Sequence, residues 1–222
     1  MRKRFRIPSI LFWMLVAGMT ILPANAETSF IWRENFLVLS TGRASFRSLY
    51  DESSRNIIAG APASILHLAE FYDARSSREW LSLYRVASDM GPAAGPILLD
   101  AADAAATDTA LWPLLVAYGA SRDTLHVDRL LRFTGSPDKR VRAAVALVCG
   151  DVALVSTQPL LAEVVHDTEA AVRRIAVDSL GRIFKAATAE SDSAALRSSL
   201  EMALDDPDPW VRRNARKALG RP

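Results

Sequence analysis

The chain has 222 residues, half of them hydrophobic, which is enough for one domain with a sizeable core and too few for two large ones. Its formal net charge of +2 depends on Arg2, Lys3, Arg4 and Arg6, since the rest of the chain carries 23 basic residues against 25 acidic ones. General nucleic-acid binding depends on many Lys and Arg side chains that displace counterions, so we expect no nucleic-acid partner.

The first 26 residues have the pattern of a secretory signal peptide. The basic residues are followed by an apolar run over residues 7–22 and by the small-x-small sequence Ala24-Asn25-Ala26. The apolar run is shorter than the roughly 20 residues that span a bilayer, and no second run of membrane length follows. We expect cleavage after Ala26, no stable membrane span afterwards, and a periplasmic or secreted protein; an uncleaved anchor is the alternative.

Residues 27–59 form an N-terminal segment that the sequence leaves open between helix and strand, and we expect a helix or cap packed on the first repeat. From residue 60 onward the apolar residues recur at helical spacing. Helices are expected over 63–72, over 79–90 and 96–106 as an antiparallel pair broken at Gly91-Pro92, and over 111–118 with 124–133 as its partner. Pro113 fits the helix over 111–118 only in its first turn.

The second half of the chain contains an internal repeat. In three segments an acidic residue stands three positions before a Val, an Arg follows that Val at once, and a Gly lies nine positions beyond it. The Val-to-Val spacings are 31 and 39 residues, a period typical of stacked helical units. The repeat positions are Asp138, Val141, Arg142 and Gly150, then Glu169, Val172, Arg173 and Gly181, then Asp208, Val211, Arg212 and Gly220.

Each repeat position has a structural reason. Asp138 and Asp208 can cap a helix N-terminus through a side-chain oxygen, where negative charge suits the helix dipole. The Val and the residue four positions later share one apolar helix face. The glycines are placed to end the helix in the left-handed conformation. A second helix is expected after each unit, over 157–166 and, after a polar loop at 189–193, around Leu196 and Leu200.

The Asp-x-x-Val-Arg…Ala-Leu-Gly pattern, written most fully at residues 208–220, resembles the HEAT repeats of phycobilisome lyase-like (PBS lyase-like) proteins. The resemblance is specific over residues 136–222 and weaker over 60–135. It implies an all-α protein, an α-solenoid of antiparallel helix pairs over residues 60–222, whose second helices line a concave surface. It implies no single activity, because such repeats serve as scaffolds, lyases and hydroxylases.

The recurring arginines allow two interpretations. Stacked repeats would align Arg142, Arg173 and Arg212 in a row, which could bind anions. Alternatively each guanidinium pairs with an acid of its own or a neighbouring repeat, such as Asp167 or Asp206. We favour the ion pairs, because stacking brings these groups together and Arg matches carboxylates in a planar, two-pronged way.

Other candidate chemistry is sparse. The histidines at 67, 126 and 166 are scattered without metal-ligand spacing, so no metal and no cofactor is expected. Asp100 and Asp103 could do acid–base work, but a solvated helix face is the expected role. Cys149, the only cysteine, is expected to be a buried small hydrophobic residue.

These features favour a scaffold over an enzyme, and no catalytic residue is expected. We expect protein–protein interaction in the bacterial cell envelope, with another envelope protein or peptide as partner. A lyase-like or cofactor-handling factor and a binder of anionic surfaces are the alternatives. A half repeat at the C-terminus could leave an apolar edge for a second copy, and the oligomeric state stays open. The expected contacts on the concave face are Arg129, Arg132, Glu163, Arg197 and Glu201.

Overall fold

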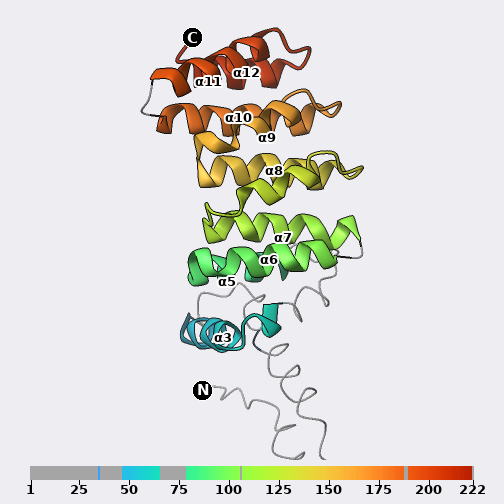
Figure 1. Cartoon of the computed structure of the whole chain (residues 1–222), viewed down its shortest axis with the longest axis vertical. Coiled ribbons are helices and arrows are strands. Elements are labelled where there is room, and N and C mark those ends of the chain that lie inside the picture. Colours follow the sequence, from blue (N-terminus) through green and yellow to red (C-terminus); the bar gives the residue numbers. More distant parts are fainter. Residues whose placement is uncertain (1–34, 36–46, 66–78, 106, 188–189, 222) are drawn as a thin grey trace, which may run out of the picture.

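The computed structural model describes residues 35, 47–65, 79–105, 107–187 and 190–221 (Figure 1). The signal peptide, its cleavage site and most of the expected helix over 63–72 lie outside the described residues. Throughout the part that is described, every regular element is a helix and no strand occurs. The expectation of an all-α fold is therefore confirmed.

The helices stack in a column in two layers (Figure 1). An N-terminal helix, α3 (Arg47–Ala59), packs on α5, the first helix of the stack. The first helices of the pairs are α5 (Glu79–Met90), α7 (Asp108–Ser121), α8 (Lys139–Val152), α10 (Ala170–Ala186) and α12 (Pro209–Ala218). The second helices are α6 (Ala94–Ala104), η3 (Val127–Phe133), α9 (Gln158–Val164) and α11 (Glu190–Met202), with short 3₁₀ turns η2 (Gly91–Ala93), η4 (Val155–Thr157) and η5 (Ala203–Asp205).

Each first helix packs mainly on the first helix before it and the one after it. The second helices cover one side of this row and form what we call the second-helix layer: α6, η3, α9 and α11. Serial packing of this kind is the defining property of a solenoid, in which each unit buries its apolar face against its neighbours.

Side-chain caps fix where the repeat helices begin. Asp138 accepts a hydrogen bond from the backbone N–H of Arg140 at 2.7 Å, and Asp208 accepts from the N–H groups of Trp210 at 2.9 Å and Val211 at 3.1 Å. These caps agree with the sequence, since a side-chain oxygen replaces the missing intrahelical acceptor. Glu169 holds the same position before α10 but makes no side-chain cap.

The repeat valines lie in one continuous core. Val141, Val172 and Val211 are fully or almost fully buried, as are Ala176 and Ala215 one helical turn further on. The core extends through α7, where the ring of Tyr118 is fully buried and its hydroxyl donates to the backbone carbonyl of Asp123 at 3.0 Å. The polar end of this large side chain is thereby satisfied within the core.

The repeat glycines have a different role from the one expected. Gly150 and Gly181 do not end their helices, because α8 continues to Val152 and α10 continues to Ala186. Both glycines instead allow a close approach of the next first helix. A Cβ on Gly150 would lie 2.8 Å from Cβ of Ser179, and a Cβ on Gly181 would lie 2.8 Å from Cβ of Ala218. Only the third glycine, at φ 68° directly after α12, agrees with the expected helix end.

Three boundaries also differ from the sequence-based expectation. Helix α11 begins at Glu190, so the expected polar loop at 189–193 is mostly helical. The partner expected over 124–133 is a 3₁₀ helix that begins at Val127. Pro113 is the sixth residue of α7 rather than part of its first turn, which leaves the carbonyl of Thr109 without its usual intrahelical donor.

Cys149 is buried in α8, as expected. Burial raises the pKa of its thiol to about 12, against a smaller opposing effect of a hydrogen bond with Thr157. We therefore expect Cys149 in the folded protein to react with a water-soluble disulfide reagent at pH 8 far more slowly than in urea, because the thiolate is the reacting form. Stopped-flow absorbance measures both rates, and equal rates would contradict the buried position.

Candidate functional site

The first repeat arginine is held by groups on two neighbouring repeats. Arg142 donates from Nε and Nη2 to the two carboxylate oxygens of Asp167, with the Nη2–Oδ1 distance at 3.0 Å. Its Nη1 donates to the backbone carbonyls of Ser136 at 2.6 Å and Pro137 at 3.2 Å. The guanidinium therefore joins the turn before its own helix to the turn of the next repeat.

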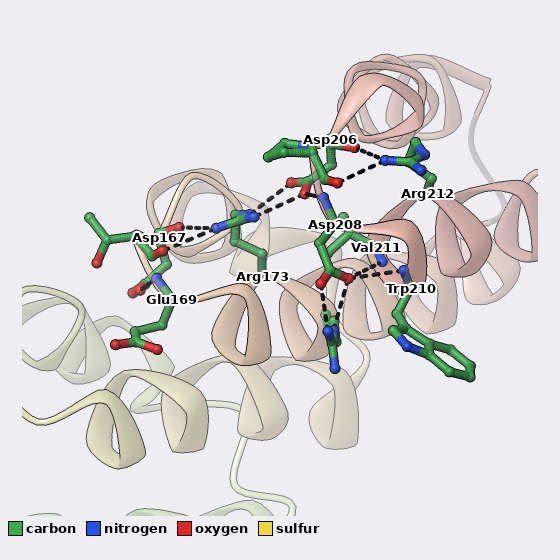
Figure 2. Close-up of polar contacts among 11 residues, drawn as sticks. Asp167, Glu169, Arg173, Asp206, Asp208, Trp210, Val211 and Arg212 are labelled. Atoms are coloured by element: carbon green, nitrogen blue, oxygen red, sulfur yellow. Dashed lines mark hydrogen bonds and ion pairs between the residues drawn. The ribbon is translucent and has the colours of Figure 1, made fainter.

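Arg173 repeats this arrangement one unit later (Figure 2). Its Nε donates to Asp206 Oδ2 at 2.7 Å and its Nη2 to Asp206 Oδ1 at 2.9 Å. Its Nη1 donates to the carbonyls of Asp167 at 2.8 Å and Thr168 at 3.2 Å. The Arg173 and Asp206 side chains are only 12% and 10% exposed, so this pair is nearly excluded from water. The ion-pair interpretation thus holds for both Arg142 and Arg173.

Asp167 and Asp206, which accept the hydrogen bonds of these arginines, occupy equivalent positions in two successive repeats. Asp167 Oδ1 also accepts from the N–H of Glu169 at 2.8 Å, and Asp206 Oδ1 accepts from the N–H of Asp208 at 2.7 Å. Each acid stands two residues before the helix cap and fixes the turn as well as the arginine. Their separation of 39 residues equals the spacing of Val172 and Val211, so the sequence contained the signal.

Ser136 occupies the same turn position in the preceding unit. Its hydroxyl accepts from the N–H of Asp138 at 3.2 Å, so it keeps the turn but offers no negative charge. The residue 31 positions before Arg142 is Leu111, which has no guanidinium to pair. Acid and arginine are therefore absent together at this junction, which supports a pairing role for both.

Arg212 has the same local support but a different neighbour. Its Nη1 donates to the carbonyls of Asp206 at 2.6 Å and Pro207 at 2.9 Å, as in the two earlier units (Figure 2). Across the described ranges, no carboxylate contacts its Nε or Nη2. Arg213 and Arg216 lie on the same edge of α12 and are exposed. This edge is basic, with the exposed ring of Trp210 beside Arg213.

The carboxylates of Asp167 and Asp206, which pair with Arg142 and Arg173, are held in their charged form. Hydrogen bonding from Arg173 lowers the pKa of Asp206 below its usual value, against the opposing effect of burial. Burial on its own would raise the pKa of Asp167, but hydrogen bonds from Arg142 and from the N–H of Glu169 outweigh it and lower the pKa. A depressed carboxyl pKa means that folding favours the deprotonated form.

The pKa shifts predict acid sensitivity. A carboxyl whose pKa is lower in the folded than in the unfolded state contributes stability above the unfolded value of about 3.9, and that contribution is lost as the pH falls below it. We expect the free energy of unfolding to fall between about pH 5 and pH 3, and to fall less in Asp206→Asn, which has no charge to lose there. Urea unfolding at several pH values measures this, and parallel curves for the two proteins would contradict it.

Most of the expected contacts of the second-helix layer are engaged within the protein. Arg129 donates to Asp100 at 2.9 Å and to Asp103 at 2.6 Å, and Arg132 pairs with Asp103 while its guanidinium lies over the Phe133 ring. The carboxylates of Asp100 and Asp103 are thus ion-pair partners of arginines. This role favours a structural function for the two carboxylates over acid–base catalysis.

The remaining three expected contacts lie on α9 and α11. Glu163 is exposed on α9. Arg197 lies over the Phe184 ring at 5.1 Å, and Glu201 accepts a hydrogen bond from Arg221 at 2.8 Å. All three side chains reach solvent, so they form a surface of alternating charge along the second-helix layer.

Large apolar side chains are exposed on the same layer. Leu131 of η3 is 55% exposed and Met202 of α11 is 57% exposed, while Leu125 lies just before η3 and is exposed as well. Sequence analysis did not single out these residues, because Leu and Met at helical spacing are usually buried. Met is among the residue types enriched at protein interfaces, where apolar groups are surrounded by polar ones.

In the part of the chain that the structure describes, no three His, Cys, Asp or Glu side chains gather to hold a metal ion. Over the same residues, no helix has the length and hydropathy needed to cross a membrane. His126 Nδ1 lies 2.7 Å from Oδ2 of the buried Asp123, His166 is exposed, and His67 lies outside the described residues.

Comparison with known proteins agrees with this geometry. Residues 127–220 match the family model for HEAT repeats. Over these residues the chain is similar to HEAT repeats, so the predicted resemblance is confirmed there. The Arg–Asp pairs described above are contacts between adjacent repeats of this region.

One solved structure supports the fold class. The structure of YibA from Escherichia coli is 17% identical, with a TM-score of 0.51, and the match covers 91% of this chain and 76% of YibA. Human deoxyhypusine hydroxylase is 14% identical, with a TM-score of 0.29 over 88% of this chain and 97% of the hydroxylase, a likeness too low to carry an argument. No curated protein sequence matches the chain.

Proposed function

We propose that this protein is an exported HEAT-repeat scaffold that binds another protein or peptide of the bacterial cell envelope through its second-helix layer. The observation that carries the proposal is the exposure of Leu131 and Met202 among charged side chains on that layer. Apolar groups surrounded by charged groups of both signs favour a protein partner over a uniform polyanion.

The ion pairs of Arg142 with Asp167 and of Arg173 with Asp206 support the same proposal. Arg142 and Arg173 are used to join repeats, so their charges are neutralised by Asp167 and Asp206 and are not offered to a ligand. Arginines that join neighbouring repeats hold the stack together. We therefore expect a partner to bind elsewhere, on the surface that the stacked repeats present. The proposed compartment rests on the leader sequence and its Ala-x-Ala site.

Site-specific photo-crosslinking in intact cells tests the partner. A photoreactive amino acid is placed at Glu163 or Met202 on the second-helix layer, and at Ala171 of α10 as the matched exposed control on the first-helix side. We expect the first two positions to yield one shared crosslinked envelope protein and the control to yield none. Equal crosslinking from all three positions, or none from Glu163 and Met202, would count against the proposal.

N-terminal sequencing of the protein from the same cells tests export. We expect the mature chain to begin at Glu27, because signal peptidase cleaves after the small-x-small site. A mature protein that still begins at Met1 would contradict cleavage. Cell fractionation in the same experiment shows whether the uncleaved form is anchored.

A further inference from the structure

The edge of α12 that faces away from α10 carries three arginines, Arg212, Arg213 and Arg216, which we call the basic edge. The repeat register explains its position. Residues 39 positions earlier are Arg173, Arg174 and Val177, and these face α12: Arg173 binds Asp206, Arg174 binds Asp208, and Val177 is buried. The basic edge is thus the surface that in earlier repeats receives the next repeat.

The guanidinium of Arg212 is already positioned for a carboxylate. Its Nη1 is fixed by two backbone carbonyls, those of Asp206 and Pro207, as the Nη1 of Arg173 is fixed by those of Asp167 and Thr168. In Arg173 the remaining pair of donors, Nε and Nη2, binds both oxygens of one aspartate. Within the part of the chain that the structure describes, the same two donors of Arg212 have no acceptor.

The surroundings of Arg212 add positive charge without neutralising it. Arg213 lies over the exposed Trp210 ring at 5.1 Å, and none of the three arginines of the basic edge forms an ion pair with a described carboxylate. A carboxylate brought to Arg212 would therefore gain a two-pronged hydrogen bond and attraction from two further charges.

We propose that the basic edge binds an acidic turn of a partner protein, of the Asp-x-Asp kind that begins a helix, with one carboxylate held by Nε and Nη2 of Arg212. The proposed partner chemistry is that of two contacts within the protein, Arg142 with Asp167 and Arg173 with Asp206. This inference rests on the proposed scaffold function but assigns a second surface, at a different place from the second-helix layer.

A peptide titration tests the proposal. The probe is a synthetic peptide with the sequence of residues 203–210, which contains the turn that Arg173 binds, and the readout is the NMR signal of the Arg212 side-chain Nε–H in the full mature chain. We expect a saturable shift of that signal. The same peptide with Asn in place of Asp206 should bind about tenfold more weakly, because it loses one charged hydrogen-bond acceptor.

Two protein variants distinguish the contribution of the paired Nε and Nη2 donors of Arg212, which we call the fork, from the contribution of positive charge alone. Arg212→Lys keeps the charge but removes the planar pair of donors, so it should weaken binding about as much as the peptide change. Arg213→Gln removes a charge but leaves the fork, so it should weaken binding only about two- to threefold. Thermal melting checks that both variants fold, and the comparison of the two peptides on the wild-type chain needs no variant.

Several results would overturn the proposal: no shift at millimolar peptide, equal binding of the Asn peptide, or wild-type binding by Arg212→Lys. Salt-sensitive binding to phosphatidylglycerol vesicles without peptide binding would assign the edge to anionic membranes instead. If Arg212→Lys still crosslinks the envelope partner from Glu163 while no peptide binds, the scaffold function stands and the assignment of the basic edge fails.

Discussion

Replacing Arg173 with alanine should lower the free energy of unfolding by about 3 kcal/mol, because it leaves the nearly buried Asp206 carboxylate without its guanidinium. The same substitution removes the donor to the carbonyls of Asp167 and Thr168, so the turn before α10 loses support as well. Breaking one member of a desolvated ion pair is costly because the remaining charge has no water to replace its partner.

Arg221→Ala is the matched control for this prediction. Arg221 also pairs with a carboxylate, that of Glu201, but both side chains are nearly half exposed, at 48% and 44%. Its loss should cost less than about 1 kcal/mol, because water replaces the partner. Urea unfolding measures the loss in both variants. Adding Asp206→Ala and the double variant Arg173→Ala/Asp206→Ala gives the coupling energy between Arg173 and Asp206. Equal losses at Arg173 and Arg221 would show that burial does not set the strength of the pair.

Replacing Gly150 with alanine should destabilise the protein by about 2 kcal/mol, although alanine is the better helix former. Gly150 lies inside α8, where a helix taken alone would gain from the change. The added Cβ would sit 2.5 Å from Oγ, 2.8 Å from Cβ and 3.0 Å from Cα of Ser179, so α8 and α10 must move apart. Differential scanning calorimetry of the purified variant measures the loss.

Two further variants isolate the cause. Gly135→Ala adds a methyl group where no atom lies within 4 Å, and its stability should change by no more than about 0.5 kcal/mol. Ser179→Gly removes the atoms that the new methyl would meet, apart from the backbone, so it should restore part of the stability lost in Gly150→Ala. A gain of stability in the single Gly150 variant would mean that the close packing of α8 and α10 is wrong.

The repeat itself could be predicted from the sequence because its parts act locally. A side-chain oxygen before a helix and valines at helical spacing are determined within about ten residues, and Asp138, Asp208 and Val141 lie as predicted. The pairing of Arg142 and Arg173 was also foreseeable, since repeats of equal design bring equal positions together.

The role of Gly150 and Gly181 could not be predicted from spacing alone. A glycine near the end of an apolar pattern suits a left-handed helix end and a close helix contact equally well. The choice depends on residues about 30 to 40 positions away, here Ser179 and Ala218, which only the packed structure brings near. The helix of the Gly150 unit ends instead at Ala153, with a φ of 48°.

The charged residues of the second-helix layer show a similar limit. Helical spacing places Arg129 and Arg132 outside the core, but their partners Asp100 and Asp103 lie on the preceding second helix, α6. Which surface charges are already paired therefore depends on how neighbouring units are rotated against each other. The exposed Leu131 and Met202 were not predicted either, because Leu and Met at helical spacing are usually buried.

The glycine contacts also set how closely α8, α10 and α12 stack on one another. In a column of units packed end on end, the tilt at each joint adds to the tilt at the next, so a small opening at one joint is amplified toward the ends. A single methyl group added between α8 and α10 would change the angle between these helices. The position of α12 relative to α5 would change by a larger distance, because both lie far from the altered contact. The span and curvature of the protein can thus be retuned by one-residue changes that leave every helix intact.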